Sequence, residues 1–154
     1  MPLTPVELDV FLAEIRLCHF ATVDEKGRPR VRPLWYLWRE GSFLLTTRME
    51  IRHTGRDLGP QKIATLSVAS DDKPYRAVIA TGEVEILGRE EALLKAVSSR
   101  YGDEGRWLAH AMTEPDRVAM RLVPKTLLSW HYGRGDSAKQ NEGVSMRMPV
   151  GDHR

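Results

Sequence analysis

Three arginines recur every four residues in the segment TTRMEIRHTGRDL, residues 46–58. If this segment is helical, Arg48, Arg52 and Arg56 lie on one face of the helix. The ordinary explanation for such a row of charges is a solvated helix surface. The alternative is a phosphate site, because guanidinium groups match the oxygens of a phosphate, and a helix N-terminus adds unpaired N–H groups and a favourable dipole.

No other group of residues in the sequence predicts a catalytic or metal centre. There is no G-x-S-x-G elbow, no Walker loop and no G-x-G-x-x-G fingerprint. The single cysteine, Cys18, cannot build a thiolate metal site, and we expect it to be a buried, inert thiol. The five histidines show no paired ligand spacing; they are His19, His53, His110, His131 and His153. We therefore predict no catalytic side chains and no metal ligands.

The composition argues against several classes of protein. The chain has 154 residues, and its 23 basic and 21 acidic residues give a net charge of +2, too small to indicate a nucleic-acid partner. The apolar runs are too short and too often charged to cross a bilayer. The start MPLTPVELD resembles no secretory signal. We expect a cytoplasmic protein with one domain, residues 1–133, and a flexible tail, residues 134–154.

The elements that must position the arginine segment are mostly strands. Hydrophobic periodicity predicts strands at residues 18–24, 30–40, 42–47, 62–70, 75–87 and 116–132. The last segment is one strand or two, because Pro124 interrupts it. Pro33 predicts an edge strand, a bulge or a place where a ligand meets the backbone, and Gly82 predicts a bend or bulge.

Short helices accompany these strands. A capping box at Thr4, with Pro5 at the first helical position, predicts a helix that ends near Leu17. Helical periodicity recurs at residues 89–102 and 104–114. Strands joined largely by hairpins, with few helices between them, predict a small antiparallel barrel with helices at its rim.

The order of these segments resembles the FMN-binding split-barrel superfamily, which includes pyridoxamine phosphate oxidases and deazaflavin-dependent reductases. The resemblance covers roughly residues 8–130 and is carried by ATVDEKGRPRVRPLWYLW, GSFLLTT, an arginine-rich helix ending in DL, KIATLSV and YRAVIATGEVEI. It implies a mainly β fold with short helices, a six-stranded antiparallel split β-barrel. It also implies a homodimer with two cofactors in grooves between the subunits.

The same resemblance implies which residues bind the cofactor. The strand after the G-x-P turn would lay its backbone against the isoalloxazine ring, at Arg32, Pro33, Leu34 and Trp35. Arg32 also matches an arginine that contacts FMN in the oxidases. Two hydroxyl-bearing residues would close the third strand, at Thr46 and Thr47. The phosphate-binding helix start falls on Arg52, His53, Thr54 and Arg56.

The chain departs from many members of the superfamily at two of these positions. They carry lysine where this chain has Thr54, and asparagine where it has Asp57, so the phosphate would be bound by Arg52 and Arg56 with the helix N–H groups. The segment HYGRGDSAKQNEG also lacks the Arg-x-His element of the pyridoxamine phosphate oxidases, which argues against vitamin B6 oxidation.

The function implied is an FMN-dependent oxidoreductase acting on an unknown small organic substrate. The alternatives are a deazaflavin-dependent reductase, or a carrier that binds flavin or haem without turnover. Ordinary structural roles also stay open: Trp35 for core or dimer packing, Thr46 and Thr47 as strand formers, and His53 as a surface residue. We expect Arg48 to be a plain surface residue.

Overall fold

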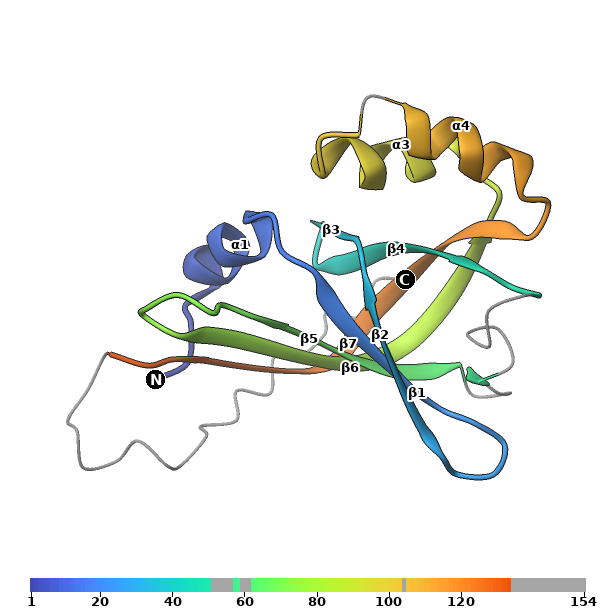
Figure 1. Ribbon diagram of the computed structural model, residues 1–154. Coiled ribbons are helices and arrows are strands. Elements are labelled where there is room, and N and C mark those ends of the chain that lie inside the picture. The colour runs from blue at the N-terminus through green and yellow to red at the C-terminus, as the bar shows by residue number, and fades with distance from the viewer. Residues whose placement is uncertain (51–56, 59–61, 104, 134–154) are drawn as a thin grey trace.

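The computed structural model describes residues 1–50, 57–58, 62–103 and 105–133. Seven strands make up most of this part of the chain: β1 (Cys18–Val23), β2 (Pro29–Leu34), β3 (Tyr36–Arg39), β4 (Ser42–Arg48), β5 (Ile63–Ala69), β6 (Arg76–Gly88) and β7 (Arg117–His131). The described helices are α1 (Pro5–Ala13), α3 (Glu91–Arg100) and α4 (Arg106–Thr113) (Figure 1). The mainly β, antiparallel prediction is confirmed.

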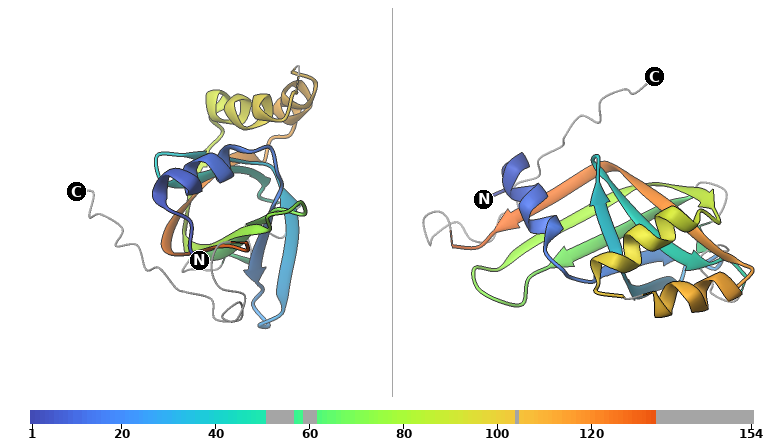
Figure 2. Two further views of the ribbon diagram at one scale, coloured as in Figure 1. Left: turned by 90° about the vertical axis from the view of Figure 1, so that its left-hand side faces the viewer. Right: turned by 90° about the horizontal axis from the view of Figure 1, so that it is seen from above.

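All seven strands form one antiparallel sheet in the order β2-β1-β5-β6-β7-β4-β3. The sheet curls round strongly (Figure 2), but its two edge strands do not pair with each other. The prediction of six strands was wrong because the segment expected as one strand, 30–40, changes its partner at Trp35. Before this residue Leu34 pairs with β1, and after it Tyr36 pairs with β4.

Helix α1 packs on the apolar interior of the curled sheet. Thr4 and Glu7 form the predicted capping box, and Phe11 and Leu12 are fully buried in the core. The helix ends at Ala13, four residues before the predicted end, because Glu14 takes an extended backbone conformation. The carboxylate of Glu14 binds Arg16, two residues further along the chain, and Arg76 on β6.

The long pair β6 and β7 bends at Gly82. The register shifts between Thr81 and Gly82, and Gly82 lies opposite Pro124. A Cβ atom at Gly82 would lie 1.8 Å from the carbonyl oxygen of Val123, so only glycine fits this close approach of two backbones. The bulge also accommodates Pro124, and β7 is therefore one continuous strand.

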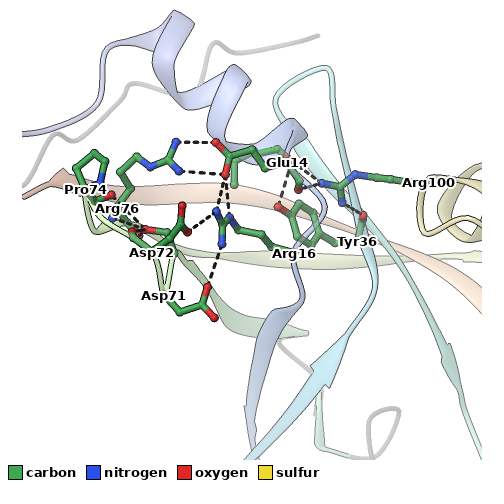
Figure 3. A network of polar contacts seen from close by, with 10 residues as sticks. Glu14, Arg16, Tyr36, Asp71, Asp72, Pro74, Arg76 and Arg100 are labelled. Atoms are coloured by element: carbon green, nitrogen blue, oxygen red, sulfur yellow. Dashed lines mark hydrogen bonds and ion pairs between the residues drawn. The ribbon is translucent and has the colours of Figure 1, made fainter.

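The polar network at the end of α1 connects three segments (Figure 3). Glu14 accepts hydrogen bonds from Arg76 at 2.6 Å and from Arg16 at 2.7 Å. Arg16 also binds Asp72, in the hairpin between β5 and β6, at 2.9 Å. Burial raises the pKa of Glu14, but the hydrogen bonds and charges of the two arginines outweigh burial, so its pKa lies below the usual 4.5.

A substitution of Glu14 tests this network. Because the folded-state pKa is lowered, the stabilisation is fully present above the ordinary pKa of 4.5 and is lost as pH falls through the folded pKa. Glu14→Gln should lower the free energy of unfolding at pH 7 by about 1–2 kcal/mol. Urea titrations should show the difference from the native protein shrinking below pH 4.5. The control Glu25→Gln, at an exposed turn, should leave the free energy of unfolding unchanged. If Glu14→Gln lowered the free energy of unfolding equally at every pH, the stabilising role of the ionised Glu14 carboxylate would be contradicted.

Candidate functional site

The change of partner at Trp35 creates a split in the sheet. Among the described residues, strand β2 pairs only with β1, so its other edge, from Pro29 to Leu34, has no described strand beside it. On the far side of the split, β3 covers β4 only from Ser42 to Leu45. The edge of β4 from Thr46 to Arg48 therefore faces the split without a strand partner among the described residues. Backbone N–H and C=O groups on both edges are placed to bind a ligand.

Arg32 lies on β2 beside this split and is held by two neighbours. Its Nη1 donates to Thr22 Oγ1 at 3.0 Å, and its Nη2 donates to Asp57 Oδ2 at 3.1 Å. Thr22 also donates to the same carboxylate oxygen at 3.4 Å. The side chain of Asp57 is only 4% exposed, whereas that of Arg32 is 19% exposed. The predicted cofactor residue Arg32 is thus already paired with an internal carboxylate.

Arg30 joins the same cluster from the same face of β2. Its Nε lies 3.2 Å from Asp57 Oδ2, a distance short enough for an ion pair, although the N–H is not aligned for a hydrogen bond. Its Nη2 lies 3.4 Å from Asp24 in the hairpin between β1 and β2. Hydrogen bonds from the backbone and side chain of Arg28 lower the pKa of Asp24 to about 2. Asp24 is therefore a carboxylate throughout the physiological range.

The two threonines at the end of β4 are both buried, but they point to opposite faces of the strand. Thr47 shares the face of Phe43 and Leu45, which belong to the central core. Thr46 shares the opposite face with Leu44, which lies outside that core. The hydroxyl pair predicted from the sequence is therefore not presented on one face, and only the backbone edge is common to both residues.

Arg48 was expected to be a plain surface residue, and this was wrong. Its Nη2 lies 2.6 Å from Asp116 Oδ1, and its Nη1 lies 3.4 Å from Glu114. The backbone N–H groups of Met49 and Glu50 donate to Asp116 as well, each at 3.0 Å. Asp116 thereby fixes the point at which the chain leaves β4.

Trp35, which lies between β2 and β3, packs against two other aromatic rings. Its ring lies parallel to that of Tyr101, with the centroids 4.9 Å apart, and 5.5 Å from the ring of Trp107 on α4. Leu34 packs against the core, and Pro33 is exposed on the edge strand, as its missing N–H predicts. The ring of Trp35 is half-buried and has a packing role within the chain.

The predicted phosphate-binding residues lie outside the described residues; they are Arg52, His53, Thr54 and Arg56. Two described residues that flank this segment in the sequence are bound to neighbouring side chains. Glu50 is bound to Asp116 beside β4, and Asp57 is bound to Arg32 on β2.

Two ordinary kinds of site can be checked in the described part of the chain. Cys18 is fully buried, as predicted, and burial raises the pKa of its thiol to about 12, which disfavours the reactive thiolate. Among the same residues, His, Cys, Asp and Glu side chains form no group of three that could bind a metal. The described helices include none that is long and apolar enough to span a membrane.

Sequence reasoning missed Thr22 and Arg30 as members of the site, and it named Asp57 only as a position where the chain departs from its relatives. One signal was available, since Arg30 and Arg32 are two residues apart and must share a strand face. The hairpin register, which pairs Thr22 with Arg30, depends on the turn at Gly27 and gave a second signal. The partnership of both arginines with Asp57 is a long-range contact that no local pattern indicates.

The fold is that of the FMN-binding split-barrel superfamily. A family model described as pyridoxamine 5'-phosphate oxidase matches residues 4–131, and the chain belongs to that family. No curated protein matches the chain.

Solved structures of other proteins share the fold. The conserved hypothetical protein Rv2991 from Mycobacterium tuberculosis is 23% identical with a TM-score of 0.70, over 84% of this chain and 85% of that one. A structure described as an F420 reductase is 26% identical with a TM-score of 0.64, over 77% of this chain and 94% of that one. HutZ, the haem storage protein from Vibrio cholerae, is 21% identical with a TM-score of 0.63, over 82% of this chain and 94% of that one.

Proposed function

We propose that the protein is an FMN-dependent oxidoreductase that acts on a small organic molecule and holds its flavin along the split. The observation that carries this proposal is a pair of strand edges that have no strand partner in the part of the chain that the structure describes, from Pro29 to Leu34 on β2 and from Thr46 to Arg48 on β4. An isoalloxazine ring carries hydrogen-bonding atoms along one edge, and a bare strand edge offers matching N–H and C=O groups.

The residues of the split fit such a ligand. The backbone of Arg32, Pro33, Leu34 and Trp35 would lie against the ring, and that of Thr46 and Thr47 would border it on the other side. The phosphate would be bound by the segment that contains Arg52, His53, Thr54 and Arg56. Bound FMN would supply hydride transfer, which is why this proposal needs no catalytic side chain. The chain itself would position the flavin and exclude water.

Two alternatives use the same split. A deazaflavin coenzyme is supported by the F420 reductase among the similar structures. A carrier of flavin or haem without turnover is supported by the fold shared with a haem storage protein. Flavin absorption bands in the purified protein favour the first proposal, whereas a strong Soret band favours haem. Oxidation of reduced flavin by small acceptors, faster than with unbound flavin, separates an oxidoreductase from a carrier.

The outer face of β2, β1 and β5 is suited to a second copy of the chain. Three aliphatic side chains are exposed there: Val23 at 55%, Val31 at 64% and Ile63 at 43%. They are neighbours, since Val31 lies opposite Ala21, and Ala21 lies opposite Thr65, two residues from Ile63. A cluster of this kind next to the split favours a homodimer in which the partner would cover the ring.

The phosphate role is tested by Arg52→Ala and Arg56→Ala. A charge-assisted hydrogen bond contributes about 1.5–3 kcal/mol, so each variant should bind FMN about tenfold to hundredfold more weakly. Titration followed by flavin fluorescence gives the dissociation constants. Arg39→Ala is the matched control, because Arg39 is an exposed arginine on β3. Unchanged FMN binding in both test variants would refute the phosphate role.

The dimer is tested by mass in solution. Light scattering at micromolar concentration should give twice the 17.5 kDa of one chain. Val31→Glu would put a carboxylate on the proposed interface and should give a monomer, while Val10→Glu, on the exposed side of α1, should remain a dimer. A native protein that is already monomeric would remove the partner subunit from the site.

A further inference from the structure

Two arginines and a threonine converge on a single oxygen of Asp57. Arg32 Nη2, Arg30 Nε and Thr22 Oγ1 lie 3.1, 3.2 and 3.4 Å from Oδ2 of that carboxylate. This is the arrangement by which proteins bind one oxygen of an anion. In this chain the oxygen belongs to the protein itself.

Asp57 changes the electrostatics of the split. Its side chain is 4% exposed, so its charge is poorly screened by water and acts strongly on both guanidinium groups. One negative charge thus compensates one of the two positive charges that β2 presents beside the split. Arg32 has the larger share of this compensation, since its contact is an aligned hydrogen bond whereas that of Arg30 is not.

We propose that Asp57 is a specificity-determining residue that limits how strongly the site prefers a phosphorylated flavin over an unphosphorylated one. This inference rests on the proposed flavin function. With Arg32 compensated by Asp57, and Arg30 by Asp57 and Asp24, the described part of the site recognises the ring mainly through backbone edges and gives little attraction to the phosphate. Removing the Asp57 charge releases the Arg32 guanidinium toward an anion, while Arg30 keeps Asp24 as a partner.

The experiment compares FMN with riboflavin, which has the same ring and no phosphate. Dissociation constants are measured for both in the native protein and in Asp57→Asn, which keeps an oxygen acceptor for Arg32 and Thr22. We expect FMN to bind about tenfold more tightly to the variant, with riboflavin unchanged. The gain should disappear when Arg32→Gln is added to Asp57→Asn. Asp72→Asn has the same change in net charge at an exposed site in the hairpin between β5 and β6, and should leave both constants unaltered.

The outcomes separate this inference from the proposed function. If neither the native protein nor Asp57→Asn binds flavin, the proposed function and this inference both fail. If both bind flavin with the same ratio of FMN to riboflavin affinity, or if the variant prefers FMN less, the inference alone is overturned.

A second variant tests the inference even if Asp57→Asn does not fold. Arg32→Gln alone should weaken FMN binding less than about threefold, and a loss of tenfold or more would overturn the inference.

Discussion

The fold depends on polar contacts that stabilise the point where one strand becomes two. At Trp35 the chain leaves β1 and joins β4, and the C-terminal end of α3 binds the backbone groups around this junction. The hydroxyl of Tyr101 accepts from the N–H of Tyr36 at 3.0 Å and donates to the carbonyl of Arg16 at 2.5 Å. Arg100 donates to the carbonyls of Leu12, Glu14 and Tyr36. Without these donors, partly buried carbonyl groups at the junction would lose hydrogen bonds, at a cost in stability.

The same junction determines what the split can bind. Because β2 and β4 separate at Trp35, each keeps an edge without a strand partner in the described part of the chain. Asp116 binds Glu50 beside β4, and Asp57 binds Arg32 on β2. The carboxylate of Asp57 also compensates the arginines on β2. Asp57 therefore contributes both to the stability of the fold and to the net charge beside the split.

The sequence predicted the elements better than their connections. Strands, the Thr4 cap, the Gly82 bulge and the edge position of Pro33 follow from local rules, and the structure has all of them. The division of one strand at Trp35 depends on Tyr101 and Arg100, about 65 residues away, and no periodicity indicates it. The ion pairs of Arg48 with Asp116 and of Arg32 with Asp57 are long-range for the same reason. The sequence therefore drew attention to Arg32 and Arg48 but did not indicate the carboxylates that form ion pairs with them.

We propose that a flavin lies along the split between β2 and β4, and a crystal structure of the protein grown with FMN would locate it. We expect an isoalloxazine ring against the backbone of residues 32–35, bordered by the end of β4. A ring bound elsewhere, such as on the outer face of β5 and β6, would contradict it.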